Sequence, residues 1–173
     1  EGREALEKLL ATADVFICNW RQSPLKRAGL DWETLHEKYP KLVYGYVSGY
    51  GEKGPDKDLP GFDFTAFYAR GGILGPLRDK NSLPMLTVQG FGDHQVAMNL
   101  AAGVLAALFK AKMTGEGDHV VVSLFHSAIW DISLMLQASQ YGADSTQYPM
   151  ERWKLGNPLV LCYETADGQW LQI

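Results

Sequence analysis

The sequence is poor in the residues that build metal centres and disulfide frameworks. Of its 173 residues, two are cysteines, Cys18 and Cys162, and four are histidines. The cysteines lie in separate apolar runs without C-x-x-C spacing, and the histidines show no zinc spacing. We therefore expect no bound metal and two buried free thiols, which is typical of a reducing, cytoplasmic compartment.

Clustered positive charge and long apolar runs are also scarce. The chain has 16 Lys and Arg against 20 Asp and Glu, interspersed, for a net charge of −4. Because a nucleic-acid-binding surface needs clustered cations, we expect no nucleic-acid partner. The longest mostly apolar segment, residues 96–109, contains Asn99 and falls short of the roughly 20 residues that cross a bilayer. No membrane partner is therefore expected either.

Helical and strand-like segments alternate along the chain, which is long enough for one domain with a sizeable core. Helical spacing of apolar residues predicts helices over residues 1–12, 32–38, 62–70, 93–112 and 124–141. Strands are predicted over residues 15–18, 42–48 and 119–123, with a hairpin over 159–164 and 169–173. Residues 19–29, 49–61, 75–92 and 142–157 are expected to be loops or irregular. This alternation is typical of an α/β domain with a mostly parallel sheet flanked by helices.

Three glycines after the second predicted strand match the G-x-G-x-x-G pattern of dinucleotide sites. They are Gly49, Gly51 and Gly54. That motif needs a helix that begins at the glycines, so that the helix N-terminus meets the pyrophosphate. Pro55 and Pro60 follow here, and a helix of useful length cannot form between them. We therefore favour a surface turn, one that lines a pocket, over a dinucleotide site.

Ser123, His126 and Asp131 suggest a Ser/His/Asp hydrolase. No G-x-S-x-G elbow surrounds Ser123, however, and it stands three residues before His126 at a strand-to-helix junction. Ser123 is better explained as the N-cap of the helix that follows.

A basic segment follows the first predicted strand. It contains Trp20, Arg21, Lys26 and Arg27. Ligands of α/β proteins bind at the carboxyl ends of the strands, where these cations would suit phosphates and Trp20 could stack on a base. A solvated basic loop is the alternative, because most charge runs are solvated.

Asp93 stands between a glycine-containing loop and a long apolar-periodic segment. Gly90 and Gly92 precede it, and the helix predicted over residues 93–112 begins with it. As an isolated feature, an Asp at this place is most simply an N-cap. The positive end of the helix dipole would also keep the carboxylate ionised, which is the form of a carboxylate nucleophile.

Several short segments, in this order and spacing, carry a resemblance that runs through nearly the whole chain. They are Ala13-Asp14-Val15 with Asn19-Trp20-Arg21, Arg27-Ala28-Gly29-Leu30, Pro40-Lys41-Leu42-Val43-Tyr44, Ser48-Gly49-Tyr50-Gly51, Gly54-Pro55, Gly61-Phe62-Asp63, Gly92-Asp93, Thr114-Gly115-Glu116-Gly117, Val120-Val121-Val122-Ser123-Leu124 and Tyr163-Glu164-Thr165-Ala166-Asp167-Gly168. Together they resemble the class III coenzyme A transferases, the formyl-CoA transferase and carnitine CoA-transferase family. The segments at residues 19–22 and 55–63 resemble most the branch that acts on 2-hydroxyacyl and aryl-acrylyl CoA esters, which includes cinnamoyl-CoA:phenyllactate and 2-hydroxyisocaproate CoA-transferases.

The resemblance implies a fold and an assembly. It implies a Rossmann-like large domain, of which residues 1–173 would be the central part, with the N-terminal strand region, the family's glycine-rich loop and the small domain outside the sequence. The absence of Met at Glu1 and the stop within a predicted strand agree with a piece of a longer polypeptide. The family's fold is an interlocked homodimer, in which each chain threads the other.

The resemblance also implies site residues and chemistry. Asp93 matches the catalytic aspartate, which exchanges CoA between an acyl- or enoyl-CoA thioester and a carboxylic acid, here a 2-hydroxy acid, through an aspartyl anhydride and an aspartyl-CoA thioester. CoA is then a substrate and not a permanently bound cofactor. The residues implied to contact CoA are Asn19, Trp20, Pro24, Arg27 and Gly92. One departure is Pro60, where the family can carry a Lys near CoA.

Two alternatives remain open. A 2-methylacyl-CoA racemase shares the fold and needs a pair of bases, for which the neighbours Asp93 and His94 are candidates. A non-catalytic CoA-binding or dimerisation module is the other.

Overall fold

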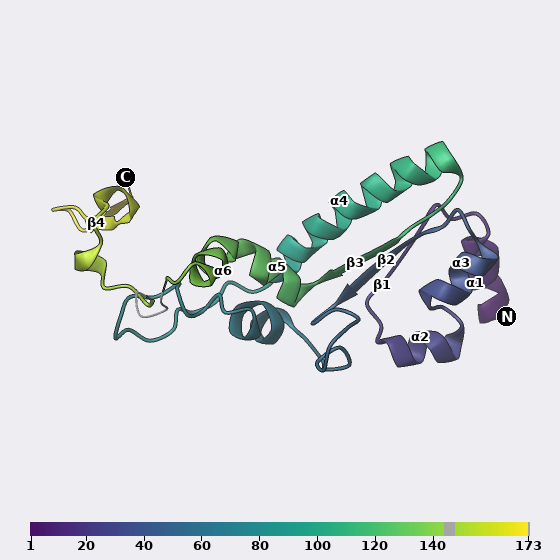
Figure 1. Cartoon of the computed structure of the whole chain (residues 1–173), viewed down its shortest axis with the longest axis horizontal. Coiled ribbons are helices and arrows are strands. Elements are labelled where there is room, and N and C mark those ends of the chain that lie inside the picture. The colour runs from purple at the N-terminus through teal and green to yellow at the C-terminus, as the bar shows by residue number, and fades with distance from the viewer. Residues whose placement is uncertain (144–147, 173) are drawn as a thin grey trace.

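A three-stranded parallel sheet is the centre of the fold. The computed structural model describes residues 1–143 and 148–172. The strands are β1 (Val15–Cys18), β2 (Val43–Ser48) and β3 (His119–Ser123), in the order β1-β2-β3. Both pairings are parallel, so that all three carboxyl ends lie at the same edge of the sheet. The prediction of an α/β fold with a parallel sheet flanked by helices is confirmed (Figure 1).

Short helices cover one face of the sheet. They are α1 (Gly2–Leu10), α2 (Gln22–Ala28) and α3 (Trp32–Lys38). Tyr44 and Tyr46 of β2 face this layer and pack with Leu10, Leu25 and Leu35. The alternation along β2, with tyrosines on one face and Val43 on the other, places apolar side chains on both faces of a central strand.

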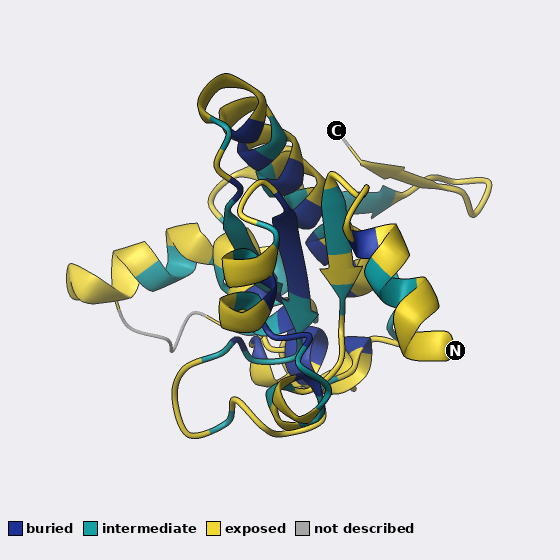
Figure 2. Ribbon diagram, turned by 90° about the vertical axis from the view of Figure 1, so that its right-hand side faces the viewer, coloured by how far each residue is buried: buried dark blue, intermediate teal, exposed yellow. Residues whose placement is uncertain are grey.

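The long helix α4 (Phe91–Thr114) covers the other face (Figure 1). Leu100 and Val104 pack against Val43. Gly45 lets the helix approach closely, because a Cβ there would lie 3.2 Å from Ile17 and 3.3 Å from Leu100. Figure 2 shows the buried residues on the central strand and on the inner side of α4, while the outer surfaces of the helices are exposed.

The apolar length of α4 exceeds what the sequence predicted. At 24 residues, it is long and apolar enough to cross a membrane by length and composition alone. The expectation that no segment reaches this length is therefore wrong, because the helix extends beyond residues 96–109 at both ends. One side of α4 packs on the sheet, and core helices of soluble proteins meet the same criterion.

Two further predictions need correction. Residues 19–29 are not a loop but contain α2, which accommodates Pro24 in its first turn and ends at Gly29 with a φ of 60°. The helix predicted over residues 124–141 is two helices, α5 (Leu124–Asp131) and α6 (Ser133–Gln140). They are separated at Ile132, whose φ of −99° and ψ of 16° interrupt the helical path.

The segment after β2 returns to the sheet through η1 (Asp63–Arg70), a π-helix that packs against α5 and α4. Helix η1 lies within the segment predicted to be helical. The chain ends in an exposed arm with the turns η3 (Arg152–Lys154) and η4 (Pro158–Val160) and the antiparallel hairpin β4 (Cys162–Glu164) and β5 (Trp170–Gln172). Figure 1 shows this arm at the far end of the molecule from α1–α3. The predicted hairpin is thus present over the described residues, and its first strand begins later than predicted, while Ile173 and residues 144–147 of the predicted loop lie outside the described residues.

Both cysteines are free, as expected, but they are half-buried and not buried. The thiol Sγ of Cys18 lies 3.3 Å from the Tyr44 hydroxyl, and burial raises the pKa of the Cys18 thiol.

Candidate active site at the start of helix α4

A cavity of about 570 Å³ lies at the carboxyl edge of the sheet. All three strands contribute the residues that follow them, and the loop before η1 and the first turns of α4 complete the wall. Its lining includes Asn19, Arg21, Ser48, Gly49, Lys57, Pro60, Asp63, Gln89, Gly90, Asp93, Val96 and Leu124. This edge is where parallel α/β sheets bind their ligands.

Asp93 lines this cavity from the first turn of α4. The helix begins at Phe91, and its N-cap is Gly90, which adopts the left-handed conformation with a φ of 78°. Asp93 is therefore the third residue of the helix, and its side chain is exposed. The N-cap interpretation of Asp93 is wrong, because Gly90 occupies that position.

Asp63 takes over the capping of α4 from a distant part of the chain. Asp63 as a whole residue is only 4% exposed. Oδ2 accepts a hydrogen bond from the Gly90 N–H at 2.7 Å, and Oδ1 accepts one from the Gly92 N–H at 2.9 Å. Sequence reasoning missed this residue, since its partners lie 27 and 29 residues further on and no local capping pattern marks it.

Although Asp93 is an exposed residue, partial desolvation of its carboxylate raises its pKa, and the negative charge of Asp63 raises it further, while His94 acts in the opposite direction. The helix dipole predicted the reverse effect. That prediction did not include a second carboxylate at the same helix end, and a like charge nearby disfavours ionisation.

Gly92 is buried beneath the cavity and is not among the lining residues. A Cβ at this position would lie 2.3 Å from Cγ of Phe67 and 2.5 Å from Oδ1 of Asp63. Glycine is therefore required so that η1 and the start of α4 can pack together. Gly92 therefore supports the packing next to Asp93, and it has no exposed surface that could contact CoA.

Of the other residues implied to contact CoA, the structure brings only Asn19 into the cavity of Asp93. Trp20 is exposed and lines a smaller neighbouring cavity of about 290 Å³, which Asn19 also lines. Pro24 and Arg27 lie on α2 outside both cavities, and Arg27 donates a hydrogen bond to Oγ of Ser23 at 2.6 Å.

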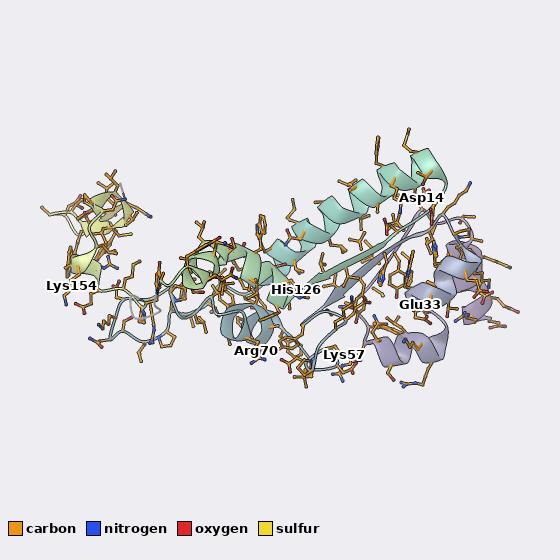
Figure 3. The ribbon with its side chains drawn as sticks, in the orientation of Figure 1. Asp14, Glu33, Lys57, Arg70, His126 and Lys154 are labelled. Atoms are coloured by element: carbon orange, nitrogen blue, oxygen red, sulfur yellow. The ribbon has the colours of Figure 1, made fainter. Side chains whose placement is uncertain are left out.

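Two cations line the cavity together with Asp93. Arg21 follows β1, and Lys57 lies on the loop beyond the carboxyl end of β2 (Figure 3). The sequence marked Arg21 as part of a basic segment but gave no reason to assign Lys57. Both side chains suit phosphate or carboxylate groups of a ligand.

The glycine motif forms turns and not a dinucleotide site. No helix follows Gly54, and the segment folds back so that a Cβ on Gly49 would lie 2.6 Å from Cα of Gly61. Gly49 lines the cavity, as the prediction of a pocket-lining turn requires.

Ser123, His126 and Asp131 do not form a triad. Oγ of the buried Ser123 accepts a hydrogen bond from the His126 backbone N–H at 3.1 Å, which confirms Ser123 as the N-cap of α5. Oδ1 of Asp131 instead accepts from Nε2 of Gln95 on α4 at 3.2 Å. In the described part of the chain, no group of three or more His, Cys, Asp or Glu side chains is arranged to hold a metal ion.

These features define an α/β domain with a cavity at the carboxyl edge of its sheet and, within the described residues, a carboxylate at a helix start that has no hydrogen-bond or ion-pair partner. The whole chain, residues 1–173, matches CoA-transferase family III. The chain belongs to this family, which confirms the resemblance seen in the sequence.

Two curated relatives are similar over the whole chain. The chain is 51% identical to cinnamoyl-CoA:phenyllactate CoA-transferase of Clostridium sporogenes and 45% identical to (R)-2-hydroxy-4-methylpentanoate CoA-transferase of Clostridioides difficile. It covers 42% and 43% of their lengths, so it spans less than half of these relatives.

A solved structure shows the same fold. The crystal structure of a CAIB/BAIF family protein from Brucella suis matches with a TM-score of 0.83 and 26% identity, over 98% of this chain and 44% of that one.

Proposed function

We propose that the protein transfers coenzyme A between an acyl- or enoyl-CoA thioester and a carboxylic acid, with Asp93 as the nucleophile. The observation that carries this proposal is the position of Asp93. Its carboxylate lines the cavity at the carboxyl edge of the sheet. It does not cap the helix, because the N–H groups of Gly90 and Gly92 donate their hydrogen bonds to Asp63 instead. The two curated relatives described above are named for this type of transfer, and both names include a hydroxy acid or its salt.

In the first half of the proposed reaction, a carboxylate oxygen of Asp93 attacks the thioester carbonyl carbon. The carbon–sulfur bond breaks, CoA leaves as the thiolate, and an aspartyl anhydride forms. The thiolate then attacks the aspartyl carbonyl carbon of the anhydride. The donor acid leaves as its carboxylate, and CoA is held on Asp93 as a thioester.

The second half reverses these steps with the acceptor. The acceptor carboxylate attacks the carbonyl carbon of the aspartyl thioester. The CoA thiolate leaves, and a second anhydride forms between Asp93 and the acceptor. The thiolate attacks the acceptor's own carbonyl carbon, so that acceptor-CoA leaves and the Asp93 carboxylate is restored. No net proton is taken up or released, and the site must exclude water because both intermediates hydrolyse.

Arg21 and Lys57 are suited to hold anionic parts of the substrates, since both line the cavity with Asp93. The backbone N–H groups of Gly90 and Gly92 are occupied by Asp63. The donors that stabilise the oxyanion of each attack must therefore be other groups.

A racemase is the less favoured function. Its proposed base pair, Asp93 and His94, consists of consecutive helical residues, whose side chains point about 100° apart around the axis. Asp93 lines the cavity, whereas His94 does not. The pair is therefore not assembled on one wall.

Trapping of the covalent intermediate tests the proposal. The full-length protein is incubated with cinnamoyl-CoA without an acceptor, quenched with hydroxylamine or borohydride, and mapped by mass spectrometry, with Asp93→Asn as the control. Modification of Asp93 in the wild type alone is the expected result. No modification, together with deuterium exchange at the α-carbon of a 2-methylacyl-CoA, would instead support the racemase. CoA binding with no loss of transfer in full-length Asp93→Ala would show that residues 1–173 act as a non-catalytic CoA-binding or dimerisation module within a longer enzyme.

A homodimer and a cytoplasmic location are part of the same proposal. The family resemblance implies the interlocked dimer, and the outer face of α4 supports a covering partner, since Met98, Leu105, Phe109 and Met113 are exposed there. Light scattering of the full-length protein tests the dimer.

The free thiols of Cys18 and Cys162 agree with a reducing compartment.

A further inference from the structure

The buried carboxylate of Asp63 is directly connected to the peptide groups that lead into Asp93. Asp63 is the first residue of η1, and it accepts hydrogen bonds from the N-cap residue Gly90 and the second helical residue Gly92 of α4. These two N–H groups flank Phe91 and immediately precede Asp93. Asp63 therefore fixes the backbone on the N-terminal side of Asp93 at two points.

The surroundings leave Asp63 little freedom to move. Phe67, one helical turn along η1, is fully buried and packs over Gly92, where even a methyl group would overlap with both Phe67 and Asp63. The aromatic rings of Phe67 and Phe91 also pack, with their centroids 6.3 Å apart. A carboxylate held in such tight packing determines where the first turn of α4 lies.

Asp63 also places a second negative charge beside Asp93. The charged neighbours of Asp93 are Asp63 from η1 and His94 from α4 itself, and Arg21 and Lys57 line the same cavity. In the proposed reaction, acylation converts the Asp93 carboxylate into a neutral anhydride or thioester. This conversion removes the repulsion between two neighbouring carboxylates, so the charge of Asp63 favours the acylated states over the free carboxylate.

We infer that Asp63 is a positioning residue for the transfer reaction: it holds Asp93 in place through Gly90 and Gly92, and its negative charge favours the acylated states of Asp93. This inference rests on the function proposed above for Asp93. A neutral capping side chain could bond the same N–H groups, but it would not supply the charge.

The test compares Asp63→Asn with the wild-type full-length protein. Asparagine has nearly the same shape, but it loses the charge and one of the two acceptor oxygens. The matched control is Asp31→Asn, since Asp31 is also buried and caps a helix, α3, but does not line the cavity. For each protein, kcat and KM for the acyl-CoA are measured across pH, and folding is checked by circular dichroism.

Three results are expected. In Asp63→Asn, kcat falls about 10- to 100-fold while KM changes less than about threefold, because misplacement of a reacting group affects chemistry more than binding. The acid limb of kcat/KM moves to lower pH in this variant, since the like charge is gone. Asp31→Asn changes neither kcat nor the acid limb.

An Asp63→Asn protein with wild-type kcat and an unmoved acid limb would overturn the inference. If this variant does not fold, the wild-type profile decides, because an acid limb at or below the ordinary pKa of aspartate excludes a repelling neighbour. Asp63→Glu adds a second measurement, since it keeps the charge and must lower kcat without moving the limb. Failure to trap an adduct on Asp93 in the wild type would reject the proposed function itself, whereas a trapped adduct with an unaffected Asp63→Asn rejects only the role of Asp63.

Discussion

Helices α3 and α4 begin in opposite ways. Helix α3 is capped locally by Asp31, which accepts hydrogen bonds from the Thr34 N–H at 3.3 Å and the Thr34 hydroxyl at 2.9 Å. Helix α4 has a glycine at its N-cap and receives its cap from Asp63, 27 residues earlier in the chain. The acidic residue of α4's own first turn, Asp93, is thereby released to line a cavity. A helix start that is capped from outside leaves its own carboxylate available for chemistry.

The two helix starts also differ in electrostatics. For Asp31, burial acts to raise the pKa, but the hydrogen bonds from Thr34 oppose it, and the net pKa is lowered. For Asp93, partial desolvation and the charge of Asp63 both raise the pKa. The ionised form of an aspartate is therefore stabilised at the start of α3 and destabilised at the start of α4. Carboxyl groups with a shifted pKa are common at functional sites.

The largest effect is expected from removal of the free carboxylate. Asp93→Ala in the full-length protein should reduce kcat for CoA transfer by at least about 10³-fold, because the covalent nucleophile is lost. Asp31→Ala should retain wild-type kcat. Both values are measured with the same acyl-CoA and acceptor acid. Transfer near the wild-type rate in Asp93→Ala would remove the functional contrast between the two helix starts.

The second-largest effect is expected at Gly92, whose close contact with η1 brings Asp63 to the start of α4. Gly92→Ala places a Cβ against the ring of Phe67 and the carboxylate of Asp63, and we expect it to destabilise the protein by about 1–3 kcal/mol through overpacking. It should also lower kcat, since Asp63 is displaced. The control is Gly156→Ala, which has no atom within 4 Å of the added Cβ. Chemical unfolding of both variants gives the comparison, and equal stabilities would contradict the packing described here.

This difference between the helices also explains how much of the molecule could be predicted from its sequence. The cap of α3 was predictable, because Asp31 and Thr34 are three residues apart and the pattern is local. For the same reason, Ser123 was recognised as the cap of α5, and the strands 15–18 and 119–123 were placed correctly from their β-branched and aromatic runs.

What the sequence did not predict depends on tertiary contacts. Asp63 acts on residues 27 and 29 positions away, so no spacing rule connects them. Lys57 reaches the cavity through the fold of a loop that a glycine–glycine contact closes. Gly92, which the family resemblance implied to contact CoA, is buried, and a Cβ there would overlap with Phe67 and Asp63, a packing constraint that no local pattern in the sequence indicates.

Loss of a local cap should have a modest and purely structural effect. Ser123→Ala and Asp31→Ala each remove a side-chain acceptor from a helix N-terminus, and each is expected to lower stability by about 1 kcal/mol. Ser123→Ala should leave CoA transfer largely intact, which distinguishes a cap from a nucleophile. Denaturant unfolding and initial rates are measured for both variants. A large loss of rate in Ser123→Ala would restore the hydrolase-like interpretation of that residue.

The smallest effect has opposite signs at the two helix starts. For a carboxyl group whose pKa is raised on folding, the stability that it contributes is fully present below the unfolded-state pKa and is lost as pH rises through the folded-state pKa. Asp93 is such a group, so its ionised form weakens the fold at neutral pH. For Asp31, with a lowered pKa, stability is present above the unfolded-state pKa and is lost as pH falls through the folded-state pKa. Asp93→Asn should therefore raise Tm slightly at pH 7, and Asp31→Asn should lower it, with both differences shrinking in acid. Thermal unfolding at pH 7 and in acid measures these shifts. A lowered Tm for Asp93→Asn at pH 7 would show that Asp93 also has a capping role, so that the two helix starts would no longer differ in kind.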